Sequence, residues 1–92
     1  MAEVLTIQEE ELQLIEAAYK DMVESIKSEM EELDLQNIRK AYELALDAHQ
    51  KQRRKSGEPY IFHPIAVATI AAAEIGLGPT AIISALLHDV VE

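Results

Sequence analysis

Two segments with few polar side chains constrain the fold of this chain more than any other feature. Segment 65–75 contains two polar residues and segment 81–91 contains three. A helix that is apolar on nearly all sides is normally buried on nearly all sides. Pro64 suits the first turn of one helix, and Gly76 with Gly78-Pro79 marks the end of that helix and the start of the next. The sequence therefore predicts core helices over Ile65–Ile75 and from Thr80 to the end.

Two amphipathic helices are predicted before these. Apolar residues recur every three or four positions over Gln8–Leu33, which indicates one helix with one buried stripe. A second stripe follows Asp34, a good N-cap, and fades near Lys51. The stripes consist of Leu12, Ile15, Tyr19, Met22, Ile26, Met30 and Leu33, then Leu35, Ile38, Tyr42, Ala45 and Leu46.

Composition and charge exclude several classes of protein. The chain has 92 residues, a net charge of −9 and no cysteine, so it forms one small domain without disulfides or thiol chemistry. Overall acidity argues against DNA and anionic membranes as partners. With no apparent secretion signal and no long apolar stretch, we expect a cytoplasmic location.

These patterns together predict an all-α helical bundle with two parts. Residues 1–34, which carry all of the net charge, form an acidic amphipathic helix, and residues 35–92 form part of a larger helical domain. Two amphipathic helices can hardly enclose two apolar ones, so we expect a truncated domain, cut within its fourth helix. Exposed apolar surface and self-association are the expected consequences.

His88 and Asp89 are the residues most at odds with their surroundings, because an ionisable pair in an apolar helix is costly unless it is satisfied. Imidazole and carboxylate together suit manganese, iron or zinc. Adjacent helical residues point about 100° apart, so such a metal needs further ligands, and His63 is the candidate. His49 could be a fourth ligand or support the site, although a packed helix residue is the favoured interpretation.

A basic run, 51–55, precedes the turn Ser56-Gly57-Glu58-Pro59 and leads toward His63. Cations after a helix C-terminus can simply complement its dipole. In the loop between the second and third helices, however, Arg53, Arg54 and Lys55 could place phosphate-binding groups near a metal.

These residues resemble a known family. The run 48–68, with its string R-K-S-G-E-P-Y-x-x-H-P, is similar to the hydrolase domain of RelA/SpoT proteins, bacterial enzymes that make and degrade the alarmone (p)ppGpp. The run 85–92 resembles the His-Asp motif of the same domain. The resemblance covers about residues 35–92, and Lys51 departs from it where many members have glycine.

The resemblance implies roles for individual residues. His63, His88 and Asp89 would bind Mn²⁺ together with an aspartate beyond residue 92, and Arg54, Lys55 and Ser56 would contact the guanine nucleotide. Glu92 would be the first of two acids that act on the attacking water. The substrate would be guanosine tetra- or pentaphosphate, (p)ppGpp, which would be hydrolysed at its 3′-pyrophosphate. Because this chain has only three of the four metal ligands, it is expected to be inactive.

Two other functions stay open at this point. The chain could be a small helical interaction or oligomerisation module without catalysis, in which the acidic first helix and the apolar fourth bind a partner. It could also be an HD-type phosphohydrolase for another nucleotide, although the string over residues 54–60 argues against that.

Overall fold

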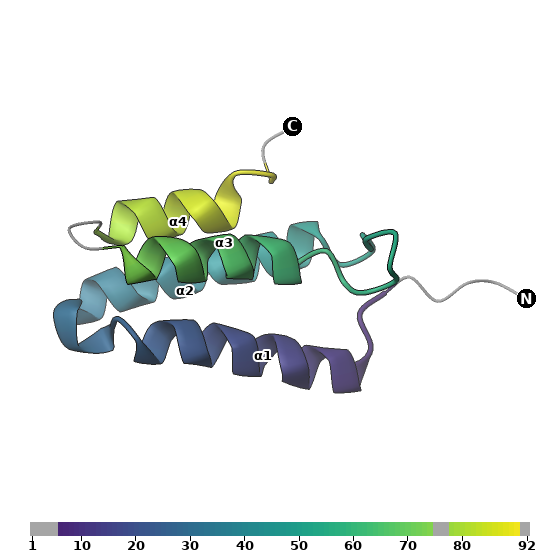
Figure 1. The fold of residues 1–92 in the computed structure, drawn as a ribbon, viewed down its shortest axis with the longest axis horizontal. Coiled ribbons are helices and arrows are strands. Elements are labelled where there is room, and N and C mark those ends of the chain that lie inside the picture. Colours follow the sequence, from purple (N-terminus) through teal and green to yellow (C-terminus); the bar gives the residue numbers. More distant parts are fainter. Residues whose placement is uncertain (1–5, 75–77, 91–92) are drawn as a thin grey trace, which may run out of the picture.

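The computed structural model describes residues 6–74 and 78–90, which form a bundle of helices (Figure 1). The elements are α1 (Glu9–Glu24), the short 3₁₀ helix η1 (Lys27–Glu29), α2 (Glu32–Ala48), α3 (Phe62–Ala73) and α4 (Pro79–Leu87). Successive α-helices run in opposite directions, with α3 packed against α1 and α4 and with α4 also packed against α2. The all-α prediction is confirmed, and within the described residues the only β pairing is an isolated bridge between Arg53 and Pro59.

The prediction of one helix over Gln8–Leu33 is wrong, because α1 ends at Glu24. The Ser25 hydroxyl donates to the Met22 carbonyl oxygen at 2.6 Å, and the Ile26 amide donates to the Val23 carbonyl at 3.0 Å. These bonds satisfy carbonyls of the last turn in a tighter pattern than an α-helix, which allows the chain to turn.

The second helix also begins earlier than predicted. Glu31, not Asp34, is the N-cap of α2, and Asp34 lies in the first turn. The Asp34 Oδ2 accepts a hydrogen bond from the Glu31 amide at 3.2 Å, so Asp34 caps the helix from a position three residues after the N-cap.

The predicted apolar stripes form most of the core. Ile15, Tyr19, Met22 and Ile26 are buried, but Leu33 is 64% exposed. The stripe fails at Leu33 because residues 9–33 do not share one helix axis. From the second stripe, the structure buries Ile38, Tyr42 and Ala45.

A polar cluster joins α1 to α2 beside this core; we call Glu16, Tyr19, Arg39 and Tyr42 the mid-bundle cluster. The two tyrosine rings stack with centroids 4.1 Å apart, and the Arg39 guanidinium lies over both. Glu16 accepts hydrogen bonds from Tyr42 Oη at 2.8 Å and from Arg39 Nη1 at 3.1 Å. Aromatic contact and charge pairing thus bind the two amphipathic helices together.

Helices α3 and α4 match the two apolar segments with shifted ends. Helix α3 begins at Phe62, three residues earlier than predicted, and ends at Ala73, before the predicted end at Ile75, which itself lies outside the described residues. Helix α4 begins with Pro79 after Gly78, but it ends at Leu87, so the prediction that it continues through His88 and Asp89 is wrong. Those two residues lie in a turn, with the Val90 amide donating to the Leu87 carbonyl at 3.0 Å.

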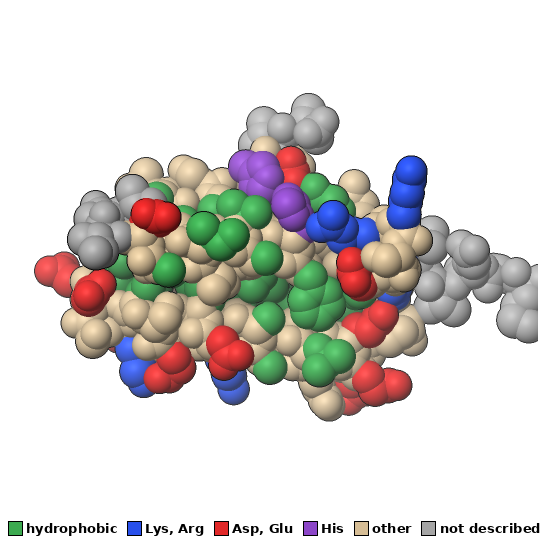
Figure 2. All heavy atoms as spheres, in the orientation of Figure 1, with side chains coloured by type: hydrophobic (Ala, Val, Ile, Leu, Met, Phe, Trp, Pro, Cys, Tyr) green, Lys and Arg blue, Asp and Glu red, His purple; other side chains and the backbone are tan. Residues whose placement is uncertain are grey.

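Some large apolar side chains are exposed. Leu14, Leu33, Leu44 and Ile70 are each more than half exposed, the last at 65%, and Figure 2 shows hydrophobic side chains on the visible face. Among the described residues, no helix has the length and apolar character needed to cross a membrane.

Candidate functional site

Three candidate ligands that are separate in the sequence meet at one place in the fold. His63 lies in the first turn of α3, and His88 and Asp89 follow the end of α4. Because these antiparallel helices pack together, their potential ligand atoms all lie within 4.8 Å of one another. The two imidazole centroids are 5.8 Å apart. The structure therefore brings together the three residues that the sequence analysis proposed as metal ligands.

The orientation of His88 suits a cation. Its Nδ1 lies 2.7 Å from the Ala85 carbonyl oxygen, which can only accept, so Nδ1 must carry the proton. Nε2 then faces Asp89 Oδ2 at 3.1 Å. When Nε2 carries no proton, it and the carboxylate oxygen can both offer an electron pair to a cation placed between them. A backbone acceptor on the other ring nitrogen is also the usual support of a metal-binding histidine.

Tyr60 contacts the same carboxylate oxygen of Asp89 as His88 does, and the sequence analysis gave it no role. Its hydroxyl donates to Asp89 Oδ2 at 2.5 Å, and this bond lowers the pKa of Asp89 below its ordinary value of 3.8. The Tyr60 ring lies between two imidazoles, with centroids 4.9 Å from His49 and 5.6 Å from His63. Its place three residues before His63 was the available signal, but only the fold shows that it reaches Asp89.

His49 is a packed helix-end residue and lies outside the three-ligand group. It is 3% exposed, and its Nδ1 is hydrogen-bonded to the side-chain oxygen of Gln52. Its Nε2 is buried without a hydrogen-bond partner among the described residues. The structure thus agrees with the favoured interpretation of His49.

The predicted nucleotide-binding residues surround an open cavity of about 430 Å³ next to the ligand group. Its lining consists of Arg53, Arg54, Lys55, Ser56, Tyr60 and His63. Figure 2 shows histidine side chains close to basic side chains on this face. Because His63 belongs to both the cavity and the ligand group, an anion in the cavity would lie next to the candidate metal position.

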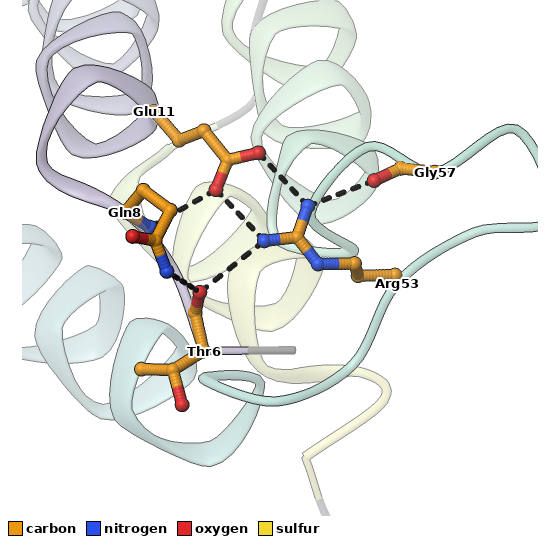
Figure 3. A network of polar contacts seen from close by, with 5 residues as sticks. All are labelled: Thr6, Gln8, Glu11, Arg53 and Gly57. Carbon is orange, nitrogen blue, oxygen red and sulfur yellow. Dashed lines mark hydrogen bonds and ion pairs between the residues drawn. The ribbon is translucent and has the colours of Figure 1, made fainter. Parts of the chain in front are cut away.

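The basic side chains of this loop differ in their surroundings. Arg54 Nε is 3.8 Å from a Glu58 carboxylate oxygen, which also accepts a hydrogen bond from the Ser56 hydroxyl at 2.8 Å. Arg53 is held much more firmly, because both of its terminal nitrogens bind the Glu11 carboxylate at 2.8 Å (Figure 3). The two terminal nitrogens of Arg53, which could otherwise bind a phosphate, are therefore occupied by the Glu11 carboxylate. The side chains of Arg54 and Lys55 are exposed.

Glu92, the candidate catalytic acid, lies outside the described residues, so its predicted role stays a prediction. The proposed further ligand, an aspartate after residue 92, lies outside this sequence.

Comparison with known proteins agrees with this geometry. The family model of the HD domain matches residues 41–92, more than half of the chain and all three candidate ligands. The chain belongs to the HD domain family. No solved structure matches it significantly.

Curated relatives of this HD domain chain have related names. It is 52% identical over 59 residues to "Bifunctional (p)ppGpp synthase/hydrolase RelA" of Mycobacterium tuberculosis, a match covering 64% of the chain and 8% of that protein. It is 45% identical over 74 residues to the corresponding SpoT protein of Escherichia coli, covering 80% and 10%. The match to "Guanosine-3′,5′-bis(diphosphate) 3′-pyrophosphohydrolase" of Aquifex aeolicus is 51% over 57 residues, covering 62% and 8%. The chain thus spans about a tenth or less of these relatives.

Proposed function

We propose that this chain is part of a hydrolase domain that removes the 3′-pyrophosphate of (p)ppGpp. The observation that carries the proposal is the meeting of His63, His88 and Asp89 beside a cavity lined by basic side chains. The names of the relatives supply the substrate class, since several are hydrolases of this nucleotide.

His63, His88 and Asp89 would hold a divalent cation, for which two nitrogens and one carboxylate oxygen are suitable donors. We propose Mn²⁺ as that cation. When bound, it would supply Lewis-acid activation of water and of the phosphoryl group. Tyr60 and the Ala85 carbonyl oxygen keep two of the ligands in orientation before binding.

Arg54, Lys55 and Ser56 would bind the nucleotide. Guanidinium and ammonium groups offset the charge that develops on phosphate oxygens during transfer, and the Ser56 hydroxyl offers a further donor. Glu92 would orient the water or accept its proton. The water oxygen would then bond to the phosphorus nearest the ribose while the bond from that phosphorus to the 3′-oxygen breaks. A proton from the water passes to the 3′-oxygen, so the products are GDP or GTP and pyrophosphate.

The direct test uses a chain extended through the following helices, mixed with ppGpp and Mn²⁺. We expect release of pyrophosphate, and we expect Asp89→Ala to abolish it. Asp21→Ala, which removes an exposed carboxylate from α1, is the matched control and should retain full turnover. Unchanged turnover with Asp89→Ala would overturn the metal-binding role. The chain of 92 residues is expected to be inactive by itself.

A helical interaction module is the second candidate, favoured by the exposed Leu14, Leu33, Leu44 and Ile70. Sedimentation of this chain together with an Mn²⁺ titration separates the two. A stable oligomer without metal binding favours the module, and metal binding favours the hydrolase. A screen of other nucleotides with the extended chain tests the remaining alternative, a different substrate.

A further inference from the structure

The Arg53 guanidinium joins two segments that lie more than forty positions apart in the sequence. Nη1 and Nη2 each donate to one oxygen of the Glu11 carboxylate at 2.8 Å, which makes a bidentate pair (Figure 3). Nη2 also donates to the Thr6 carbonyl oxygen at 3.2 Å, and Nη1 donates to the Gly57 carbonyl oxygen at 2.8 Å. One side chain therefore binds the start of α1 and the tip of the basic loop together.

The bonds of Arg53 fix the loop at both ends of the proposed nucleotide-binding residues. Arg53 pairs with Pro59 in the isolated bridge, and its side chain holds the carbonyl of Gly57. Between these points the Arg54 amide donates to the Glu58 carbonyl at 2.9 Å and the Gly57 amide donates to the Arg54 carbonyl at 2.8 Å. Gly57 has a φ of +99°, which glycine adopts at little cost. Arg54, Lys55 and Ser56 thus lie within a turn that is closed from outside by Arg53.

Further hydrogen bonds hold the N-terminal side of this contact. The Gln8 amide donates to Glu11 Oε1 at 3.0 Å, and the Ile7 amide donates to the Gln50 carbonyl at 3.2 Å. The Arg53 hydrogen bond is the main cause that lowers the pKa of Glu11 to about 2, so this carboxylate is charged throughout the neutral range. The start of α1 therefore presents a fixed anion to a fixed guanidinium.

We propose that Glu11 and Arg53 form a latch through which the N-terminal segment holds the anion-binding loop in its binding shape. Arg53 is then a positioning residue and not a phosphate ligand. This inference rests on the proposed function and deepens it, because it assigns part of the nucleotide site to a segment outside the residues matched by the HD family model.

The latch and a simple charge effect make opposite predictions for one substitution. Glu11→Gln removes a negative charge near an anion-binding cavity and releases the Arg53 guanidinium. A charge effect alone therefore predicts tighter anion binding. The latch predicts weaker binding, because the loop loses its anchor and must be ordered when the anion binds.

The first experiment measures hydrogen exchange at the Arg54 and Gly57 amides of the 92-residue chain without ligand. We expect exchange to be about tenfold faster in both Glu11→Gln and Arg53→Gln, since each loses charge-assisted hydrogen bonds. Glu10→Gln, the same change at the neighbouring exposed position, should leave exchange unchanged. Unchanged exchange in Glu11→Gln and Arg53→Gln, with helix content preserved by circular dichroism, would overturn the latch.

The second experiment measures GDP binding to the same variants by NMR titration. We expect Glu11→Gln and Arg53→Gln each to weaken GDP binding severalfold, with the double variant no weaker than either one. Arg53→Lys keeps the positive charge but cannot make the bidentate pair with Glu11. Weakened GDP binding by this variant supports the latch, and GDP binding as tight as that of the wild type contradicts it. Tighter binding by Glu11→Gln would overturn the positioning role. If the wild-type chain fails to bind GDP, the role of the latch in binding fails, while pyrophosphate release by the extended chain still decides the proposed function and exchange still decides whether the latch holds the loop.

Discussion

The molecule contains two tyrosine–carboxylate pairs in different surroundings. In the mid-bundle cluster, Tyr42 donates to Glu16, and Arg39 supplies the positive charge that Glu16 needs. At the candidate metal site, Tyr60 donates to Asp89 Oδ2, and the same oxygen lies 3.1 Å from His88 Nε2. One pair is complete within the protein, and the other faces imidazoles that remain able to accept a cation.

The pKa shifts of the carboxylates follow this difference. Burial opposes ionisation of Glu16, but hydrogen bonds from Tyr42 and Arg39 outweigh it and lower its pKa. For Asp89 the hydrogen bond from Tyr60 is the main cause of the lowered pKa. Shifted carboxylate pKa values occur both at functional sites and in structural ion-pair networks. The imidazoles around Asp89 fit the first case, and the Arg39 partner of Glu16 fits the second.

Loss of a ligand should give the largest effect that separates the two clusters. We expect His63→Ala and His88→Ala each to lower Mn²⁺ affinity more than about 100-fold, since even indirect supports of a metal site are worth about 10–100-fold. Glu16→Ala should leave Mn²⁺ affinity unchanged. Paramagnetic broadening of NMR signals during an Mn²⁺ titration measures all three, and equal broadening in the histidine variants would contradict the metal site.

Removal of one hydroxyl from each tyrosine should sharpen the comparison. We expect Tyr60→Phe to weaken Mn²⁺ binding about 10–100-fold with little change in the free energy of unfolding. Tyr42→Phe should lower the free energy of unfolding by about 1–2 kcal/mol and leave Mn²⁺ binding unchanged. Urea denaturation and the same Mn²⁺ titration report the two effects. Equal metal affinity in the two variants would show that Tyr60 does not orient Asp89.

A smaller effect is expected from pH at Glu11. Its pKa is lowered from 4.5 to about 2, so its pair with Arg53 stabilises the fold above pH 4.5 and the stabilisation disappears as pH falls toward 2. The difference in free energy of unfolding between wild type and Glu11→Gln should shrink over that range. Urea denaturation of the two proteins at successive pH values checks this, and a difference that does not shrink would contradict it.

The smallest effect is expected at Leu33, which the apolar stripe wrongly placed in the core. Because its side chain is 64% exposed, Leu33→Ser should change the free energy of unfolding by less than about 0.5 kcal/mol. Ile26→Ala, in the fully buried part of the stripe, should cost about 2–5 kcal/mol. A large loss at Leu33 would mean that this residue is covered in solution.

Periodicity predicted the helical class and most of the core, but not where α1 ends. The apolar spacing continues through Ser25 to Leu33, so nothing in the pattern shows the break. The break results from local hydrogen bonds of Ser25, Ile26 and Glu31, which compete with continuation of the helix. Similarly, apolar residues continue around His88, so the pattern does not show that α4 ends at Leu87.

The three candidate ligands were predictable as residue types, and their meeting could be expected from the family resemblance. The contributions of Tyr60 and Glu11 could not be found in this way. Each acts across a contact between distant segments, twenty-nine positions for Tyr60 to Asp89 and forty-two for Glu11 to Arg53. A single sequence gives no spacing rule for such contacts, because they depend on how the helices pack.

The alternating direction of the helices has a practical consequence. The connection between α1 and α2 lies at the opposite end of the bundle from the basic loop that leads into α3 (Figure 1). Ser28 in that connection is exposed. A cysteine introduced there would give this cysteine-free chain a single attachment point for a fluorophore or a solid support, at the end of the bundle opposite the proposed nucleotide cavity.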